Sequence, residues 1–387
     1  MKEWKTYKLY EVASLTTGFP FAGEKYAKEG TRVVRGDNVT IGALRWDSEK
    51  LKCWNEPFER FNEFSLKEGD IVIGMDGSRV GQNRAQVKNE DLPLLLAQRV
   101  ACIRNNEKSI QDFLYYLIFN NRFVDYVKQV QTGTSIPHIS LKQIGNYEVN
   151  LPSIETQTKI SQILRTLDNK IEINKRINDN LEQQAEALYK SWFVDFEPFK
   201  DQEFVESEFG LIPEGWQCTT LSELLSIKYG KDHKKLAEGT IPVYGSGGLM
   251  RYVDTKLHEG EAVLIPRKGT LNNVMYVNEA FWTVDTMFYS IPKQENSCIY
   301  AYLFLANKDL ASMNAGSAVP SMTTDILNNM LIIAPPAEVL RQFNNISNVY
   351  FSRINQNNIE NANLSNQRDT LLPKLMSGEL KVNEIDC

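Results

Sequence analysis

The sequence predicts a mixed α/β chain of two globular domains joined by two long antiparallel coiled-coil helices, with an internal pseudo-two-fold duplication. Three observations favour this fold class: the length, a repeated sequence pattern, and two long segments with heptad spacing of apolar residues. A length of 387 residues is typical of two to three domains. A hydrophobic content of 42% with 24% charged residues excludes wholesale disorder.

Five residues near the N-terminus return 212 positions later in the same order. They are Trp4, Leu9, Glu11, Ser14 and Gly18, followed by Trp216, Leu221, Glu223, Ser226 and Gly230. In both copies we expect a short amphipathic helix that ends at a glycine C-cap. Further along, EGDIVIG (68–74) returns as EGEAVLI (259–265), at an offset of 191.

The second part of the repeat keeps its spacing for more than fifty residues. It starts where TGTSIPHIS (132–140) returns as AGSAVPSMT (315–323), and the offset then stays at 183. Because the offset falls from 212 to 183, the first variable half is 29 residues longer than the second. Each repeat therefore consists of a variable globular part followed by a segment of constant length.

Each constant segment is predicted to form one long helix. Residues 154–190 contain no proline or glycine, their apolar residues recur every three or four positions, and residues 337–372 follow in the same register. A helix of about 35 residues is about 50 Å long. The expected seam consists of Ile160, Leu164, Leu167, Ile171, Asn174, Leu181 and Leu188 in the first segment and Phe343, Tyr350, Ile354, Asn357, Leu364 and Leu371 in the second. Asparagine in such a seam fixes the register at a cost in stability.

The alternative is two unrelated helices that each pack on their own domain, but the shared phase of the segments favours a common coiled coil. Since the order is domain, helix, domain, helix, the second helix must run antiparallel to the first. Domains at the ends of a spacer about 50 Å long could reach successive major grooves of DNA, which are about 34 Å apart. The expected boundaries are 1–152 for the first domain, 153–192 for the first spacer helix, 193–213 for an acidic connector, 214–335 for the second domain, 336–380 for the second spacer helix and 381–387 for the tail.

The sequence shows no sign of a membrane, a secretory signal or a metal site. No apolar run approaches the roughly 18 residues that span a bilayer, and the start MKEWKTYKLY lacks a signal-peptide core, so we expect a cytoplasmic protein. Five cysteines form no CxxC pair and three histidines are scattered, so we expect reduced thiols and no bound metal.

Five stretches of the sequence carry a resemblance to a known family. They are ALYKSWFVDFEP (187–198), GLIPEGW (210–216), RDTLLPKLMSGEL (368–380), TSIPHISL (134–141) and LPSIETQ (151–157). With the duplicated frame, they make the whole chain resemble the specificity subunit of a type I restriction–modification system.

The resemblance implies two target-recognition domains that bind double-stranded DNA at an asymmetric bipartite target, and a subunit that performs no chemistry itself. It implies two methylation subunits on the helices, which use S-adenosylmethionine on an adenine in each half-site. Restriction and translocase subunits, with ATP and Mg, would complete the complex. In the second repeat Ser321 replaces His138 and Leu340 replaces Gln157, so we assign no essential role to His138 or Gln157.

The sequence carries no pattern for catalysis. A Gly-rich cofactor loop, a phosphate-binding loop and the Asn-Pro-Pro-aromatic motif of amino-methyltransferases are absent. Asp195, Glu197 and Lys200 resemble a nuclease-like acidic pair with a lysine, but their place in an acidic connector with Pro198 favours a solvated linker. A self-sufficient enzyme is thus disfavoured; an adaptor that binds proteins through two domains remains the main alternative.

Residues for reading DNA are expected on loops that combine glycine with basic or amide side chains. Such loops are GMDGSRVGQNR (74–84) and VVRGDNVTIG (33–42) in the first domain, and KYGKDHKK (228–235), YGSGGLMRY (244–252) and PRKGTLNN (266–273) in the second. The candidate contacts are Arg35, Asn38, Arg79, Gln82, Asn83, Arg84, Lys231, Lys234, Lys235, Tyr244, Arg251, Arg267, Lys268, Asn272 and Asn273. Ordinary polar turns are the alternative, because they favour the same residue types.

The formal net charge of −6 argues against a nucleic-acid partner only until its distribution is considered. Residues 195–208 hold six acidic residues and one basic residue, whereas residues 228–275 hold eight basic and five acidic residues. The acidic excess therefore belongs to the connector, and the basic side chains gather on the candidate loops.

Overall fold

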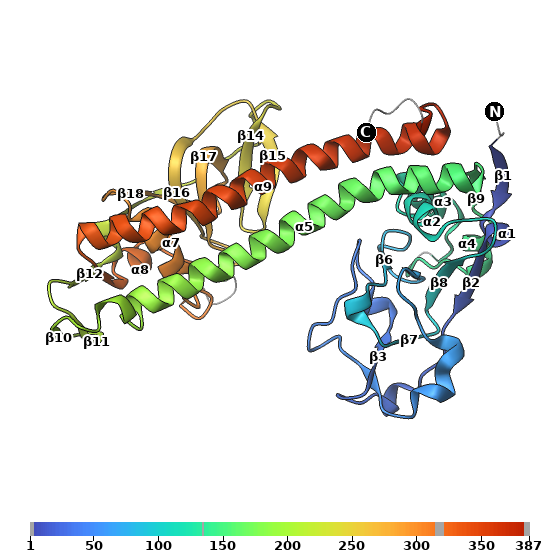
Figure 1. The fold of residues 1–387 in the computed structure, drawn as a ribbon, viewed down its shortest axis with the longest axis horizontal. Helices are drawn as coiled ribbons and strands as arrows, with labels where there is room; N and C mark the ends of the chain where they lie inside the picture. The colour runs from blue at the N-terminus through green and yellow to red at the C-terminus, as the bar shows by residue number, and fades with distance from the viewer. Residues whose placement is uncertain (1–3, 134, 314–320, 383–387) are drawn as a thin grey trace. The chain divides into compact units, whose positions relative to one another are not determined.

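The computed structural model describes residues 4–133, 135–313 and 321–382. The chain divides into two compact units, residues 1–172 with 361–387, and residues 173–360. We call the globular part before the first long helix the first head, and the part between the two long helices the second head. The long helices are α5 (Ile154–Phe193) and α9 (Ala337–Ser377), and each contributes one half to each unit (Figure 1).

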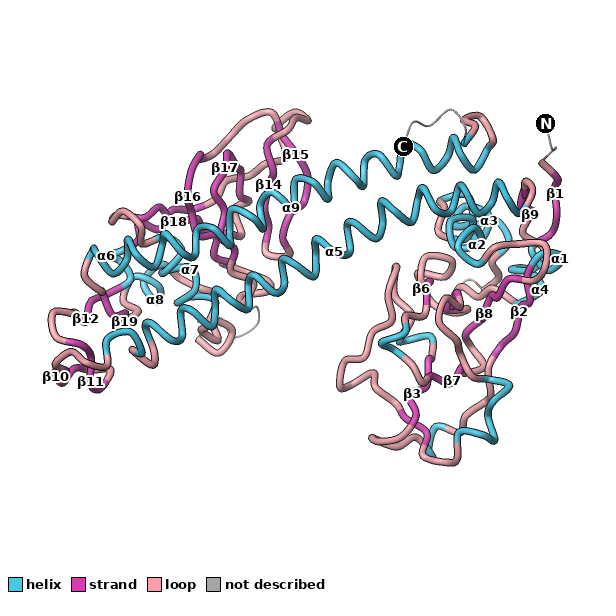
Figure 2. The backbone as a smooth tube through the Cα atoms, in the orientation of Figure 1, coloured by secondary structure: helices cyan, strands magenta, loops and turns pink. Residues whose placement is uncertain are grey.

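In the described residues of the first head, three small sheets combine with four α-helices (Figure 2). Its elements are β1 (Lys5–Lys8), α1 (Leu9–Val12), β2 (Ala13–Thr17), β3 (Thr31–Val34), β4 (Cys53–Trp54), β5 (Ile71–Gly74), β6 (Arg84–Gln86), β7 (Leu94–Leu96), β8 (Val100–Asn105), α2 (Gln111–Ile118), α3 (Asn121–Val130), α4 (Leu141–Gly145) and β9 (Glu148–Leu151). The strand orders are β2-β8-β5-β6, β4-β3-β7 and β1-β9. One core lies between the four-stranded sheet and the helices, and it includes Ile71, Phe113 and Leu164.

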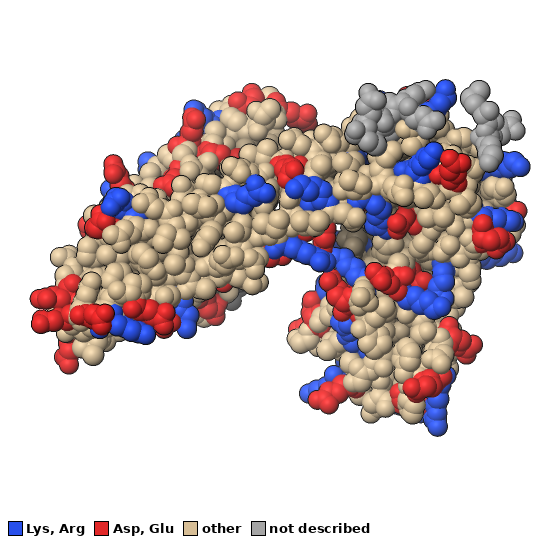
Figure 3. Space-filling view, in the orientation of Figure 1, with Lys and Arg blue, Asp and Glu red and all other residues tan. Residues whose placement is uncertain are grey.

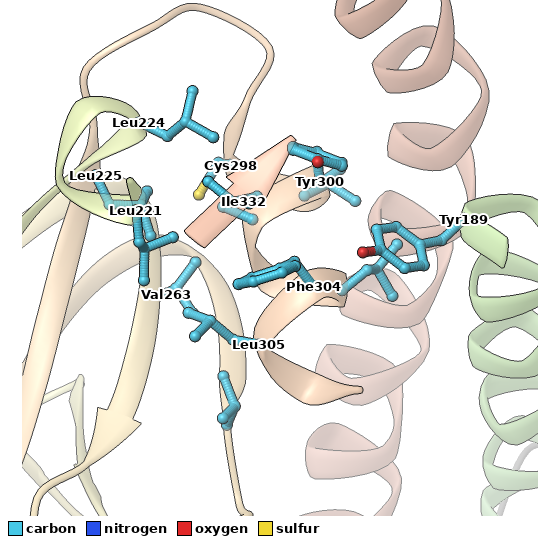
Figure 4. Close-up of a cluster of buried hydrophobic side chains, with 14 of the residues drawn as sticks. Tyr189, Leu221, Leu224, Leu225, Val263, Cys298, Tyr300, Phe304, Leu305 and Ile332 are labelled. Atoms are coloured by element: carbon cyan, nitrogen blue, oxygen red, sulfur yellow. The ribbon is translucent and has the colours of Figure 1, made fainter. Parts of the chain in front are cut away.

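The second head is built on one six-stranded sheet of order β13-β18-β16-β17-β14-β15 and a two-stranded pair β12-β19. Its elements are β12 (Gln217–Thr220), α6 (Leu221–Leu224), β13 (Leu225–Tyr229), β14 (Ile241–Gly245), β15 (Gly248–Val253), β16 (His258–Pro266), β17 (Met275–Thr283), β18 (Met287–Pro292), α7 (Cys298–Ala306), α8 (Thr324–Asn328) and β19 (Leu331–Ala334). Figure 4 shows Tyr189 of α5 beside Tyr300 and Phe304 of α7 in the core.

Strand pairing confirms the internal duplication. In the first head β1 pairs antiparallel with β9, and Lys5 lies opposite Leu151. In the second head β12 pairs with β19 in the same way, and Gln217 lies opposite Ala334. Lys5 and Gln217 are 212 positions apart, and Leu151 and Ala334 are 183 positions apart, which are the two offsets of the sequence repeat. The two repeats therefore share one backbone register at this strand pair.

One predicted offset is wrong by one residue. The shared letters EG align β5 with β16 at a sequence offset of 191. In the structure, residues of the two strands that have equivalent strand partners are 192 positions apart. Ile71 lies opposite Ile103, and Val263 lies opposite Ser290. Burial supports the offset of 192, since the side chains of Ile71 and Val263 both lie in the core that a head forms with the long helices. A shift of one residue would place each buried side chain on the opposite face of the strand. Burial therefore supports the offset of 192 over the offset of 191 that the shared letters EG indicate.

A short amphipathic helix forms at each repeat start as expected, but the predicted glycine C-cap is wrong. Only one helical turn forms, α1 in the first head and α6 in the second, and a strand follows it directly. Gly18 and Gly230 therefore follow strands and are not helix caps. A Cβ on Gly18 would lie 1.8 Å from the carbonyl oxygen of Leu96, and one on Gly230 would lie 2.0 Å from that of Val284. These glycines permit close backbone contact.

The two long helices are paired antiparallel within each unit, as predicted. In the first unit Arg368 of α9 donates a 2.9 Å hydrogen bond to Asp168 of α5. In the second unit the amide of Asn174 donates to Glu360, and the amide of Asn357 donates to Asn178. Residue numbers rise along one helix as they fall along the other.

The seam residues divide into two groups by burial. Those that are buried are Ile160, Leu164, Ile171, Asn174, Phe343, Ile354 and Asn357. Those that are half-buried are Leu167, Leu181, Leu188, Tyr350, Leu364 and Leu371. Ile160 and Leu164 belong to the core of the first head, and Phe343 belongs to that of the second. The helices therefore pack on the heads as well as on each other.

The acidic connector is more ordered than a solvated linker. After α5 it forms a hairpin of β10 (Phe204–Ser207) and β11 (Gly210–Pro213), and Phe199 is buried against Trp216 at 5.1 Å between ring centroids. Its six acidic side chains are nevertheless exposed, and acidic groups surround the hairpin in Figure 3.

Candidate nucleic-acid interface

The glycine-containing loops after β5 and β16 are held by the same backbone contacts in both heads. Asp76 forms an antiparallel bridge with His138, and Lys268 forms one with Ser321. One residue further, the amide of Ile139 donates to the carbonyl of Met75, and that of Met322 donates to Arg267, both at 2.9 Å. The two parts of the sequence repeat, found separately at different offsets, therefore meet in space.

A third segment joins each of these sites. In the first head the amide of Met75 donates to the carbonyl of Arg99, at 3.1 Å. In the second head the amide of Arg267 donates to the carbonyl of Thr286, at 2.9 Å. We call the three residues brought together the corner. The first corner is Asp76, Arg99 and His138, and the second corner is Lys268, Thr286 and Ser321.

Glycine closes the turn beside each corner. Gly77 has a φ of +107° and Gly269 has a φ of +87°, values that favour glycine over residues with a Cβ. Val80 and Leu271 follow them and are buried. The loops are thus anchored by one apolar side chain while their polar residues stay near the surface.

In the first head the corner borders an arginine-rich groove of about 660 Å³. Four arginines line it, together with aromatic residues from the segment before β3. The arginines are Arg35, Arg45, Arg79 and Arg99, and the aromatic residues are Phe19, Phe21 and Tyr26. Asp37 and Asp76 are the acidic residues of this lining, so the groove carries a positive excess.

Asp76 is the central acceptor of the first corner. One carboxylate oxygen lies 2.5 Å from Nδ1 of His138, and the other lies 3.6 Å from Nη1 of Arg99. Arg99 remains 67% exposed in its side chain. The ion-pair distance between Asp76 and Arg99 is longer than a hydrogen bond, so Asp76 attracts the guanidinium and leaves its N–H donors available for a ligand.

The predicted residues of the first head differ in exposure. Arg79 is exposed, whereas Gln82, Asn83 and Arg35 are half-buried. Arg35 lies over the Tyr26 ring, 5.6 Å from its centroid.

Two predicted residues of the first head point inward. Asn38 is fully buried, and its amide donates to the carbonyls of Arg45 and Lys50. Arg84 is buried, donates to the carbonyl of Gly81 at 2.7 Å, and has its pKa lowered by burial. The surface proposed below therefore omits Asn38 and Arg84.

In the second head the exposed predicted residues are Asn272 and four lysines. The lysines are Lys231, Lys234, Lys235 and Lys268. Arg267 is half-buried, with its guanidinium 5.4 Å from the centroid of the Tyr229 ring.

The other predicted residues of the second head hold its loops together. Arg251 donates to the carbonyls of His233 and Leu236. Asn273 donates to the carbonyl of Ser246 at 2.9 Å. These contacts fix the loops that carry the exposed lysines.

Asn272 and Tyr244 also make contacts within the head. Asn272 donates to Asp309 and accepts from the amide of Ala311. Tyr244 donates to Glu279 at 2.7 Å, and burial together with this bond raises its pKa. It borders a cavity shared with residues of α9, so it faces the helix.

Sequence reasoning missed two arginines of the groove. Arg45 and Arg99 lie outside the glycine-rich stretches, and Arg99 stands between the short strands β7 and β8. The strand that follows Arg99, β8, has its counterpart in β18. Without the strand register, that counterpart was not recognisable.

The comparisons with known proteins agree with this duplicated arrangement. The family model of the type I restriction modification DNA specificity domain matches residues 1–183 and again residues 213–365. The chain belongs to this family. The specificity subunit of the type I restriction enzyme MjaIX from Methanocaldococcus jannaschii is 27% identical over 357 residues, which cover 84% of this chain and 82% of that protein.

Two further members of the type I specificity family extend the likeness over nearly the whole chain. The specificity subunit of the type I restriction enzyme HindI from Haemophilus influenzae is 25% identical over 470 aligned residues, covering 98% of this chain and 100% of that protein. The crystal structure of the S subunit from M. genitalium has a TM-score of 0.63 at 18% identity and covers 96% of both chains. This last likeness shows the shared fold.

Two negative observations concern the described residues. Across residues 4–133, 135–313 and 321–382, no helix is long and apolar enough to cross a membrane. In the same part of the chain, no three His, Cys, Asp or Glu side chains gather as metal ligands.

Gln157 has a structural role within this frame. Its amide donates to the carbonyls of Lys108 and Pro152, and its oxygen accepts from the amide of Ile110. In the second repeat Leu340 is equally buried at the equivalent place. The position is therefore a core position in both repeats, filled by an amide in one and by an apolar side chain in the other.

Proposed function

We propose that this chain is the DNA-reading subunit of a type I restriction–modification complex, with one half-site read by each head. The observation that carries the proposal is the duplicated corner, which places a glycine turn at equivalent points of the two heads, beside an exposed cation that is Arg99 in the first head and Lys268 in the second. The family match over both repeats supports the same function. Because the side chains differ between the heads, the two half-sites differ and the target is asymmetric and bipartite.

In this proposal the chain itself catalyses no formation or cleavage of a covalent bond. Methylation would be carried out by two partner methylation subunits that use S-adenosylmethionine on an adenine in each half-site. Restriction and translocation, with ATP and Mg, would belong to further partner subunits. The exposed faces of α5 and α9 would carry the assembly, and the complex would act in the cytoplasm.

The distribution of charge fits this role. The exposed lysines of the second head and the groove arginines of the first would contact phosphates and base edges. The exposed acids of the connector would lie away from DNA. We therefore expect modest DNA affinity for the chain alone and stronger binding within the complex.

The test is a half-site exchange. Residues 1–152 are replaced by the first domain of a relative that recognises a different target, and the methylated motif is determined for the reconstituted complex. We expect only one half of the motif to change. A change in both halves, or an unchanged motif, would overturn the proposal.

The principal alternative is a two-headed adaptor whose heads bind proteins. DNA footprinting of the reconstituted complex on a duplex that carries the methylated motif separates the two functions. A footprint over both half-sites, with an affinity that falls steeply with salt, supports DNA reading. An absent footprint supports the adaptor.

A further inference from the structure

We propose that the corner is the principal base-reading site of each head, with Arg99 as the reader in the first head and Lys268 in the second. This inference rests on the proposed function and assigns residues to it. Asp76 and His138 act as positioning residues for Arg99. Thr286 and Ser321 complete the site around Lys268.

The first argument is that the backbone of the corner is the same in both heads. Each corner joins three segments that lie far apart in the sequence, through equivalent amide-to-carbonyl hydrogen bonds. A frame held by backbone contacts keeps its geometry while its side chains change. This separation allows a recognition site to alter its specificity without altering the fold.

The second argument is that all three side chains of the corner differ between the heads. A carboxylate, a guanidinium and an imidazole occupy the first corner, whereas an ammonium and two hydroxyls occupy the second. The adjoining glycines, Gly77 and Gly269, are the same. Two heads that read different half-sites need this pattern, in which the frame is kept and the donors and acceptors are replaced.

The third argument concerns the geometry of Arg99. Its guanidinium lies against Asp76, which His138 holds from the other side, and its side chain is otherwise exposed at the rim of the groove. Arginine pairs with the O6 and N7 acceptors of guanine through two parallel donors, and the nearby carboxylate of Asp76 keeps the guanidinium at this rim. The first corner is therefore suited to guanine.

The second corner provides a different chemistry. Lys268 is exposed and occupies the position that Asp76 has in the first corner. The cation of the second corner therefore lies on the glycine loop, whereas Arg99 of the first corner lies on the segment before β8. Lysine also contacts guanine acceptors, but as a point charge with rotating donors, and the Thr and Ser hydroxyls can donate or accept. We expect the second head to tolerate more sequence variation at this base pair.

The experiment measures base preference in the reconstituted methylation complex. The methylated motif of the unaltered complex is first determined, and duplexes with each base pair of that motif replaced in turn serve as substrates. Arg99→Ala is expected to lower the preference at one base pair of the first half-site by about tenfold, since the variant loses a bidentate contact to the base. Lys268→Ala is expected to act on the second half-site alone.

Matched controls separate reading from folding and from general charge. Arg60 is similarly exposed, forms an ion pair with Glu56 at 3.7 Å and does not line the groove, so Arg60→Ala should leave every preference unchanged. Lys256, paired with Glu259 on the second head, provides the same control for Lys268. Circular dichroism of each variant verifies folding.

The positioning role of Asp76 has its own readout. Asp76→Asn should reduce the preference at the base pair affected by Arg99→Ala, and the double variant should be no worse than Arg99→Ala. Additive losses in the double variant would mean that Asp76 does not act through Arg99.

The two proposals fail in different ways. A methylated motif that does not depend on this chain would overturn the proposed function. A motif that depends on the chain but keeps every base preference in Arg99→Ala and Lys268→Ala would overturn only the assignment of the corners.

Discussion

The side-chain amide of Asn357 on α9 donates a 2.7 Å hydrogen bond to Oδ1 of Asn178 on α5. Asn178 in turn donates to Oδ1 of Asn358 at 2.9 Å. Asn178 and Asn357 are buried, so their amides depend on each other for hydrogen bonds. A helix pair shifted along its axis would lose these bonds, and the asparagines thereby select one register.

Asn178→Leu is expected to destabilise the chain by about 1–3 kcal/mol, because it leaves the amides of Asn357 and Asn358 without their partner. Chemical denaturation followed by circular dichroism measures this loss. Asn345→Leu, at an exposed position of α9, is the matched control and should change stability by less than about 0.5 kcal/mol. Equal stability of both variants would show that the buried amides do not matter.

Gly18→Ala is expected to destabilise the first head by about 2 kcal/mol or more, since the added Cβ would meet the carbonyl oxygen of Leu96 at 1.8 Å. Gly23→Ala is the control, because no atom lies within 4 Å of its added Cβ. Thermal unfolding compares the two variants. A stable Gly18→Ala protein would contradict the close approach of these backbone segments.

Gln157→Leu places in the first repeat the residue type that the second repeat has at 340. The expected loss is about 1–3 kcal/mol, because the carbonyls of Lys108 and Pro152 and the amide of Ile110 lose their partner. Gln162→Leu, on the exposed side of α5, should be nearly neutral. Urea unfolding midpoints provide the measurement, and similar midpoints for the two would disprove the role of these bonds.

Replacement of both Arg267 and Lys268 by alanine is expected to weaken DNA binding without loosening the subunit assembly. The structure assigns most of the effect to Lys268, because Arg267 is half-buried over Tyr229. Lys268→Ala alone should therefore reduce the slope of log affinity against log salt by about 1 if it also contacts a phosphate. Binding titrations at several salt concentrations test this, and an unaltered affinity at moderate salt would remove the loop from the interface.

Cys102 should resist alkylation in the folded protein at pH 8. Its thiol is buried in β8, and burial, with the neighbouring Asp70, raises its pKa to about 12. The folded state therefore keeps a proton that the unfolded state releases above about pH 9. The free energy of unfolding should fall above that pH by up to about 1.4 kcal/mol per pH unit from this group. Comparison with Cys102→Ala isolates the contribution, and a parallel pH dependence of the two proteins would refute it.

The sequence repeat predicted the paired helices, and its offsets of 212 and 183 reappear in the pairs β1–β9 and β12–β19, which the sequence did not predict as strands. It did not predict that one helical turn would give way to strand after Val12. Short apolar patterns fit either structure, and here pairing of β2 with β8 decides.

The candidate site was predicted only in part. Glycine loops marked the place of the corner, and Lys268 and Arg79 are indeed exposed. The sequence pattern could not predict whether a side chain points outward or inward. Arginine and asparagine are typical DNA-contacting residues, yet Arg84 and Asn38 are buried. Arg99 could be recognised only after the strands had placed it beside Asp76.

The division of α9 between two units has a consequence for synthesis on the ribosome. The first unit contains residues 361–387, so the core around Leu164 lacks Leu375 and Met376 until the ribosome has synthesised the whole second head and most of α9. The head that is made first is thus finished last. A chain terminated before α9 would leave this apolar surface of the first head exposed and prone to aggregation.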